Sequence, residues 1–281
     1  MNFFENIQEL KSELASLVSL GYRIGFVPTM GALHDGHISL VRKSQEENEI
    51  TVVSIFVNPT QFNDKNDYIK YPRFLSKDIK KLEEIKCDIV FAPLEDVMYP
   101  DDDKREFEFD GLDKVMEGEF RPGHFRGVAL IVTKLFDIVN PDKAYFGSKD
   151  FQQVAIIKHI VKKNNIPIEI ISCPIVREKD GLAMSSRNHR LNDEQRKNAA
   201  LISKCLFEIS EKTKSLSLQE TKQYVIRNIN DNPFLEVEYF DIVNEKDLNS
   251  LSDWDKETAI RCCIAVNVGN VRLIDNIRIN F

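Results

Sequence analysis

Two histidines, His34 and His37, stand between an apolar run and a helical pattern in the stretch FVPTMGALHDGHISLV, residues 26–41. Such a junction exposes unpaired backbone N–H groups, and the helix dipole favours an anion there. Gly31 and Gly36 let the main chain approach that anion, and each imidazole can donate a hydrogen bond to a phosphate oxygen. The pattern favours phosphoryl chemistry. A metal half-site without an obvious third ligand and a purely structural turn remain open alternatives.

A second cluster, FGSKDFQQ at residues 146–153, follows another short apolar run. Lys149 would meet phosphates as a mobile point charge. Gln153 lies one helical turn after Asp150 and carries both a donor and an acceptor, which suits a hydroxyl-bearing substrate. The alternative is a Lys–Asp pair that solvates the start of a helix.

The third cluster is VREKDGLAMSSRN, residues 176–188. Ser185, Ser186 and Arg187 are three consecutive groups that bind phosphate well, and the arginine offers a planar fork of donors. A plain polar loop is the alternative.

A fourth group of polar residues follows the next strand-like run. Asn58 and Gln61 lie in FVNPTQF and suit a small polar substrate. Asp78, in YPRFLSKD, is a candidate carboxylate for a Mg²⁺ ion that bridges phosphates, although such residues more often stabilise the first turn of a helix.

The elements that must position these residues alternate between strands and helices in the first part of the chain. Helices are predicted at 7–20, 37–48, 76–87, 123–140 and 150–165, and strands at 22–28, 49–59, 88–93, 143–147 and 166–174. Ser76 is the expected cap of the third helix, and residues 95–111 are expected to be irregular. This alternation predicts an α/β fold with a doubly wound parallel sheet, in which ligands bind beyond the carboxyl ends of the strands.

The pattern changes near residue 176, which predicts two domains, 1–175 and 176–281. The second, smaller α+β domain is predicted to contain helices at 191–210 and 217–230 and strands at 234–243, 258–268 and 271–280. Gly269 and Asn270 form the expected hairpin turn between the last two strands.

Composition limits the classes of partner. The 281 residues include 42% hydrophobic residues and 18 phenylalanines, enough for a packed core, and the net charge is −7. A long polyanion is therefore a poor partner, and neither nucleic acid nor membrane is expected. Five cysteines without a Cys-x-x-Cys pair, and an N-terminus unlike a signal peptide, favour a reduced cytoplasmic protein with buried thiols.

Taken together, the motifs PTMGALHDGH, FVNPTQF, YPR, RPGHFRGV, NPDKAYFGSKDFQQ and DGLAMSSRN resemble the pantothenate synthetase (pantoate–β-alanine ligase) family of the HxGH nucleotidyltransferase superfamily. They occur in the family's order and cover most of residues 26–191. The resemblance implies a Rossmann-like first domain, a C-terminal lid domain and a homodimer. It also implies ATP and Mg²⁺, with (R)-pantoate and β-alanine condensed to pantothenate, AMP and pyrophosphate through pantoyl adenylate.

The resemblance also assigns roles residue by residue. The positions that match the family's ATP site are Met30, Gly31, Ala32, Leu33, His34, Asp35, Gly36, His37, Gly147, Ser148, Lys149, Asp150, Val176, Met184, Ser185, Ser186 and Arg187. His37 is the leading catalytic residue, supported by His34, Lys149, Ser185, Ser186 and Arg187. The substrate-binding positions are Gln61 and Gln153 for pantoate, with Gln61 also near β-alanine, and Asn58. Asp78 matches the position implicated with Mg²⁺.

Two positions depart from the family's pattern. Ser148 stands where an acidic residue is usual, and Phe74 stands where Thr is usual. Two other functions stay open: another adenylyltransferase of the superfamily, and a non-catalytic nucleotide-binding module. MSSRN is also similar to the mobile loop of aminoacyl-tRNA synthetases, but the acidic charge disfavours tRNA.

Overall fold

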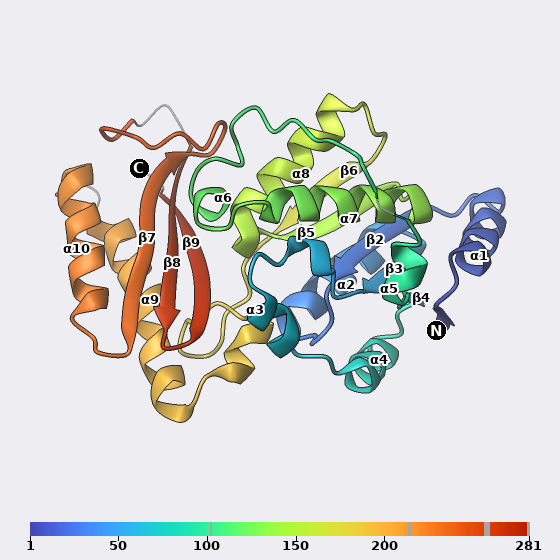
Figure 1. The fold of residues 1–281 in the computed structure, drawn as a ribbon, viewed down its shortest axis with the longest axis horizontal. Coiled ribbons are helices and arrows are strands. Elements are labelled where there is room, and N and C mark those ends of the chain that lie inside the picture. The colour runs from blue at the N-terminus through green and yellow to red at the C-terminus, as the bar shows by residue number, and fades with distance from the viewer. Residues whose placement is uncertain (102, 213–214, 256–258, 280–281) are drawn as a thin grey trace. The chain divides into compact units, whose positions relative to one another are not determined.

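The computed structural model describes residues 1–101, 103–212, 215–255 and 259–279, and its internal contacts divide the chain into two compact units (Figure 1). The first unit comprises Met1–Asp113, Arg121–Ser148 and Gln153–Pro174. The second comprises Ile175–Phe281 together with two short segments, Lys114–Phe120 and Lys149–Gln152. No local feature of the sequence separates those two segments from the first unit.

The first unit is built on a six-stranded parallel sheet. Its strands, in spatial order, are β1 (Asn2–Phe4), β4 (Ile89–Phe91), β3 (Ile50–Ile55), β2 (Ile24–Thr29), β5 (Lys143–Gly147) and β6 (Glu169–Cys173). After β2 the chain adds β3 and β4 on one side, and it then returns to add β5 and β6 on the other. This reversal makes the carboxyl ends of β2 and β5 a switch point, the usual ligand position in such sheets.

Helices cover both faces of this sheet because successive strand residues point to opposite sides. Phe26 and Val52 face a core completed by α1 (Ile7–Ser19), α7 (His124–Val139) and α8 (Phe151–Lys163). Their neighbours Val27 and Val53 face a core completed by α2 (Asp35–Glu47) and α4 (Leu75–Glu84). The remaining short elements of this unit are η1 (Pro59–Gln61), α3 (Lys65–Lys70) and α5 (Glu95–Met98). The predicted doubly wound, Rossmann-like fold is confirmed.

The second unit is an antiparallel sheet with helices on one face. Its strands are β7 (Leu235–Asn244), β8 (Ile260–Val268) and β9 (Val271–Ile279), in that order, packed against α9 (Asp193–Lys212) and α10 (Leu218–Asn230) (Figure 1). Gly269, at φ 58°, and Asn270 make the tight turn predicted between β8 and β9. All five cysteines are free and buried, and Cys262 and Cys263 lie in the β8 core as expected.

The first short segment of the second unit contains α6 (Glu117–Phe120). The buried Glu117 carboxylate accepts two hydrogen bonds from Arg272 of β9, at 2.7 and 2.8 Å, and one from the Tyr239 hydroxyl of β7, at 2.9 Å. Phe120 stacks on Tyr239 with ring centroids 5.4 Å apart. These contacts join residues 114–120 to the C-terminal sheet although more than 100 residues of sequence lie between them.

Some local predictions were wrong. Ser76 does not cap α4, because the helix begins at Leu75 and its N-cap position is Phe74, which makes no side-chain capping bond. Phe74 is also the departure from the family's Thr, a residue that could supply such a bond. Residues 95–111, expected to be irregular, include α5, and β1 and α3 were not foreseen.

Three residues that fall within predicted segments lie outside the described residues: Asp102, Thr258 and Asn280. In the part of the chain that is described, no helix combines the length and apolar character needed to cross a membrane.

Candidate active site

The paired histidines form a reciprocal cap at the start of α2. His34 is the N-cap, and its Nδ1 accepts a hydrogen bond from the Gly36 N–H at 3.2 Å. The Nδ1 atom of His37 accepts in turn from the His34 N–H at 3.3 Å. Because both Nδ1 atoms face backbone donors, a neutral ring must carry its proton on Nε2. Each ring therefore serves the helix with one nitrogen and is a donor through the other.

The two imidazoles also lie against each other, with ring centroids 4.1 Å apart. Two Nε2–H donors at a helix N-terminus create a positive electrostatic potential that favours an anion, even when both rings are neutral. The structural-turn alternative is thus compatible with a role in binding an anion, since the cap uses only the Nδ1 atoms. The metal half-site gains no support: within the described residues no group of three His, Cys, Asp or Glu side chains could hold a metal ion.

A buried carboxylate shapes the loop before these histidines. Gly31 and Ala32 have positive φ angles, 77° and 50°, which turn two successive N–H groups inward. The Asp78 carboxylate of α4 accepts from Ala32 N at 2.8 Å and from Leu33 N at 2.7 Å. A Cβ on Gly31 would lie 3.1 Å from this carboxylate, so a larger residue would press on the clamp. Burial raises the pKa of Asp78, while the two N–H groups and Lys81 favour its charged form.

The Mg²⁺ role predicted for Asp78 does not fit this geometry. The side chain is 2% exposed, and each of its oxygens accepts a main-chain hydrogen bond. A Mg²⁺ ion that keeps several waters needs open space around its carboxylate ligand. Asp78 is better described as the group that holds the loop leading into the histidine pair.

Replacing Asp78 by asparagine tests that description. Asparagine can accept one of the two N–H groups, but its own NH₂ opposes the other, which costs about 1–3 kcal/mol for a buried donor. We expect initial rates to fall about tenfold and the Mg²⁺ concentration that gives half-maximal rate to stay unchanged. Asp88→Asn is the matched control, since Asp88 accepts the Thr51 N–H at 2.8 Å. Recovery of the Asp78→Asn rate at high Mg²⁺ would restore the metal-ligand assignment.

The loop after β3 places Gln61 beside Met30. The Gln61 Nε2 atom lies 2.9 Å from the Met30 sulfur, and Gln61 is 8% exposed. The main-chain carbonyl of Gln61 contacts Nδ1 of the buried His124 at 2.8 Å. Gly127 allows α7 to approach this loop, because a Cβ there would lie 2.2 Å from Thr60 O. His124 and Gly127 were missed as supports, although both lie in the motif RPGHFRGV.

Gln153 lies in the first turn of α8 in the first unit, and its side chain is half-buried. Its neighbour Gln152 belongs to the second unit and is buried. The Gln152 amide accepts from Glu117 N at 2.9 Å and donates to Val115 O at 2.8 Å, so its role is structural. Gly147 is the last residue of β5, and Ser148, which follows it, is the last residue of that segment of the first unit.

Lys149 and Asp150 belong to the second short segment of the second unit. The Lys149 Nζ atom lies 3.3 Å from the Asp150 carboxylate. Asn276 of β9 donates to the main-chain carbonyl of Lys149 at 2.9 Å, and Arg261 of β8 donates to the Asn276 oxygen at 2.7 Å. The backbone position of Lys149 is therefore set by the C-terminal sheet. No sequence signal pointed to Asn276, which is 2% exposed.

The segment 176–188 belongs to the same unit and folds back on itself. Met184 N donates to Val176 O at 3.0 Å, and Ser185 caps η3 (Ser186–Arg190) by accepting from the Arg187 N–H at 3.2 Å. Arg177 makes a two-point ion pair with the buried Asp275 of β9, at 2.7 and 2.9 Å. Burial raises the pKa of Asp275, against the opposing charges of Arg177 and nearby Lys149. This segment is thus fastened to its own unit.

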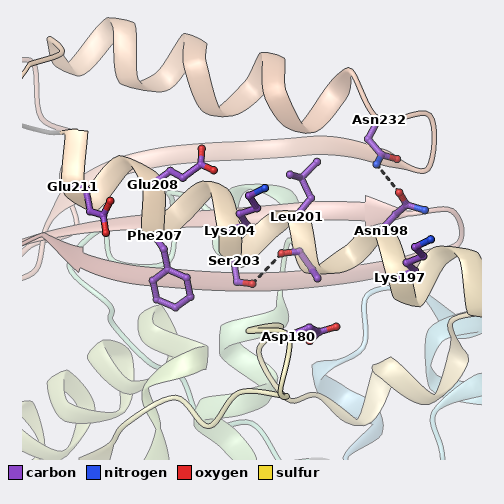
Figure 2. A pocket seen from close by; sticks show the side chains of 11 residues that line it. Asp180, Lys197, Asn198, Leu201, Ser203, Lys204, Phe207, Glu208, Glu211 and Asn232 are labelled. Carbon is purple, nitrogen blue, oxygen red and sulfur yellow. Dashed lines mark hydrogen bonds between the residues drawn. The ribbon is translucent and has the colours of Figure 1, made fainter.

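A separate open groove of about 610 Å³ lies on α9 (Figure 2). Lysines 197 and 204 and glutamates 208 and 211 give its wall both signs of charge. Residues from the four predicted clusters contribute only Asp180 to its lining, and Asp180 is paired with Arg196 at 2.6 Å. We therefore assign this groove no part in the proposed chemistry.

Comparison with known proteins identifies the family. The model of the pantoate-β-alanine ligase family matches residues 2–278. The chain belongs to this family. The pantothenate synthetases of Bacteroides thetaiotaomicron and Phocaeicola vulgatus are 52% and 53% identical to it, and each match covers 99% of both chains.

Solved structures of pantoate-β-alanine ligases agree with the fold. The pantothenate synthetase of Thermus thermophilus is 38% identical, with a TM-score of 0.93 over the whole of both chains. The Francisella tularensis ligase, complexed with Beta-gamma ATP and Beta-alanine, is 38% identical, with a TM-score of 0.84 over 99% of this chain and 97% of its own. Both matches extend through the C-terminal sheet, which lies outside the residues 26–191 that the motifs cover.

Proposed function

We propose that the protein condenses (R)-pantoate with β-alanine in an ATP-dependent reaction that yields pantothenate, AMP and diphosphate through a pantoyl-adenylate intermediate. The observation that carries this proposal is the reciprocal histidine cap at the N-terminus of α2. It places two imidazole Nε2–H donors beyond the carboxyl end of β2, at the switch point of the sheet. Family membership supplies the identity of the acid and the amine.

In the first step, a carboxylate oxygen of pantoate attacks the α-phosphorus of ATP. The new P–O bond forms as the bond to pyrophosphate breaks. No base is needed, because the attacking carboxylate is already ionised near neutral pH. The enzyme must align the reactants and stabilise the charge on the phosphoryl oxygens. We assign that stabilisation to His34 and His37 in the first unit, and to Lys149, Ser186 and Arg187, with Ser185, in the second.

In the second step, the uncharged amine of β-alanine attacks the acyl carbon of pantoyl adenylate, and AMP leaves with the electrons of the acyl–oxygen bond. The adenylate must be shielded from water until then, since hydrolysis would waste ATP. We propose residues 1–175 as the nucleotide- and pantoate-binding domain and residues 176–281 as the lid. Within that lid, the ion pair of Arg177 with Asp275 fastens residues 176–184 to β9.

The pantoate contacts in this proposal are Gln61 and Gln153, and the other ATP contacts come from residues 30–37, residues 147–150, Val176 and Met184. Mg²⁺ would accompany the triphosphate and neutralise part of its charge, and Asp78, whose two oxygens accept main-chain hydrogen bonds, would not hold it. A homodimer and a cytoplasmic location also belong to the proposal, as the family resemblance implies.

The decisive test is isotope exchange from pyrophosphate into ATP. We expect exchange with pantoate present and β-alanine absent, because the adenylate step runs backwards when pyrophosphate is supplied. Without pantoate, the exchange should fall to background. If AMP forms from both substrates together but no exchange occurs with pantoate alone, the two-step mechanism is wrong. If exchange occurs but β-alanine yields no pantothenate, the protein activates pantoate and passes the pantoyl group to an acceptor other than β-alanine.

A further inference from the structure

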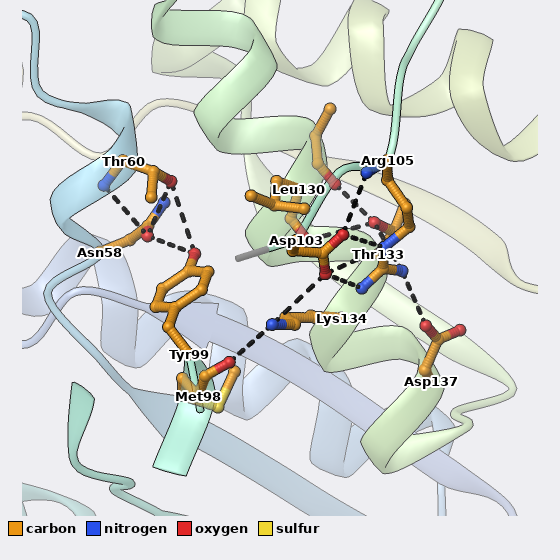
Figure 3. A network of polar contacts seen from close by, with 11 residues as sticks. Asn58, Thr60, Met98, Tyr99, Asp103, Arg105, Leu130, Thr133, Lys134 and Asp137 are labelled. Atoms are coloured by element: carbon orange, nitrogen blue, oxygen red, sulfur yellow. Dashed lines mark hydrogen bonds and ion pairs between the residues drawn. The ribbon is translucent and has the colours of Figure 1, made fainter. Parts of the chain in front are cut away.

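A chain of hydrogen bonds leads from Tyr99 through Asn58 to Gln61, and Figure 3 shows the Tyr99–Asn58 part of it. The Tyr99 hydroxyl donates to the Asn58 Oδ1 atom at 2.7 Å, and the Asn58 amide nitrogen donates to the Gln61 Oε1 atom at 3.1 Å. Asn58 is 1% exposed and Gln61 is 8% exposed. All three residues belong to the first unit. The first two therefore act on the predicted substrate-binding glutamine from the side of the protein interior.

Two main-chain groups identify which end of the Asn58 amide is the nitrogen, because their donor and acceptor identities are unambiguous. Its nitrogen faces the Gly127 carbonyl at 3.1 Å, and its oxygen faces the Thr60 N–H at 3.4 Å. A flipped amide would oppose a donor to a donor and an acceptor to an acceptor. Both hydrogens of the nitrogen are used, by Gly127 and by Gln61. Asn58, expected from the sequence to contact substrate, has no donor left for one.

The amide of Gln61 is oriented as a consequence. Its oxygen is engaged by Asn58, so its nitrogen is turned to the other side, where Met30 sulfur, a weak acceptor, lies 2.9 Å away. We propose that Tyr99 and Asn58 are positioning residues that fix Gln61 as a hydrogen-bond donor, so that it selects a carboxylate or hydroxyl oxygen of the acid substrate and disfavours a cationic group. This inference rests on the proposed function, in which that acid is pantoate.

Tyr99 is itself held by charged neighbours (Figure 3). Lys134 Nζ lies 4.5 Å from the centroid of the Tyr99 ring, donates to Met98 O at 2.7 Å and pairs with Asp103 at 3.3 Å. A cation over the ring restrains its position. Burial raises the Tyr99 pKa above its ordinary value, so the hydroxyl keeps its proton near neutral pH. The protonated Tyr99 hydroxyl can therefore donate to Asn58.

The test is Tyr99→Phe, which removes one oxygen and keeps the ring. We expect KM for pantoate to rise about tenfold, as for loss of one hydrogen bond that orders a binding group, while KM for ATP changes less than about twofold. Tyr145→Phe is the matched control, because the buried Tyr145 hydroxyl contacts Asn48 at 2.7 Å and Glu47 at 2.9 Å. It should leave both KM values unchanged.

A double-mutant cycle separates positioning from general structural support. In a Gln61→Ala background, Tyr99→Phe should have an effect below about twofold, because the group that it orients is gone. The proposal is overturned if Tyr99→Phe has equal effects in both backgrounds. It is also overturned if Tyr99→Phe changes the KM for ATP and pantoate equally, or leaves the KM for pantoate unchanged. The wild-type rate of pantothenate formation, measured in parallel, tests the proposed function itself. If the wild type forms no pantothenate, the proposed function is wrong, and this result is distinct from a failure of the Tyr99 proposal.

Asn58→Asp supplies a second variant with a stronger expected effect. The carboxylate offers only acceptors, so Gln61 should turn its NH₂ toward residue 58 and its oxygen toward the substrate. We expect KM for pantoate to rise more than about thirtyfold in protein whose circular dichroism is native. A folded Asn58→Asp variant with normal KM for pantoate contradicts the relay, and Tyr99→Phe decides the question if Asn58→Asp does not fold.

Discussion

The His37→Ala variant is expected to turn over about a thousandfold more slowly than the wild type. Removing the ring deletes the Nε2–H donor that would stabilise charge on the phosphoryl group as pantoate attacks. It also deletes the Nδ1 acceptor of the His34 N–H, so His34 loses part of its support. The measurement is the rate of AMP release at saturating ATP, pantoate and β-alanine, together with far-UV circular dichroism, which should stay native.

The control for His37→Ala is His159→Ala, which removes a histidine of the same unit whose Nε2 contacts Glu108 O at 3.2 Å. His159→Ala should retain nearly full turnover. His37→Gln should recover part of the lost rate, because its amide can donate a hydrogen bond. Near-normal turnover of folded His37→Ala would remove the histidine from the mechanism and leave it only as a helix cap.

The Lys149→Ala variant is expected to lower kcat/KM for ATP about a hundredfold, with a much smaller change in pantoate binding. The ammonium group is partly shielded, with 18% of the side chain exposed, so its charge is less screened than that of a surface lysine. Its backbone is held at the carbonyl by Asn276, so the lysine can meet the phosphates without first ordering the chain. Initial rates measured against ATP, and then against pantoate, give the two parameters.

Lys222→Ala is the matched control, because it removes the same charge from the same unit, where Lys222 pairs with Asp241 at 2.6 Å. It should not change kcat/KM for ATP. If Lys149→Ala weakens pantoate as much as ATP, the lysine does not act on the phosphates. If it weakens neither substrate, the predicted cluster at residues 146–153 is structural.

Local patterns were sufficient to predict most of the regular elements. The Lys143–Gly147 strand was predicted with the bounds that the structure has, and α7 and the β8–β9 turn were predicted to within about one residue. These features depend on residue periodicity, on glycine at positive φ and on residues that end helices, all of which are visible within one short stretch. The HDGH cap is likewise local, because all of its donors and acceptors lie within four residues.

The tertiary structure alone decided what several polar side chains do. The Mg²⁺ role predicted for Asp78 does not fit a carboxylate that accepts from two N–H groups 45 and 46 residues away. Asn58, predicted to contact substrate, accepts a hydrogen bond from Tyr99, 41 residues along the chain, and we propose that it positions Gln61 instead. The sequence gives the residue type of an amide or carboxylate, but this type is the same whether the group faces a substrate or the protein interior.

The sequence by itself therefore determined most of the strands and helices and the family, because each of these is expressed in neighbouring residues. The fold decided which of the polar groups face inward, and which element holds the backbone of Lys149. That information resides in hydrogen bonds between distant segments, whose partners become identifiable only when the chain has brought them within about 3 Å of each other.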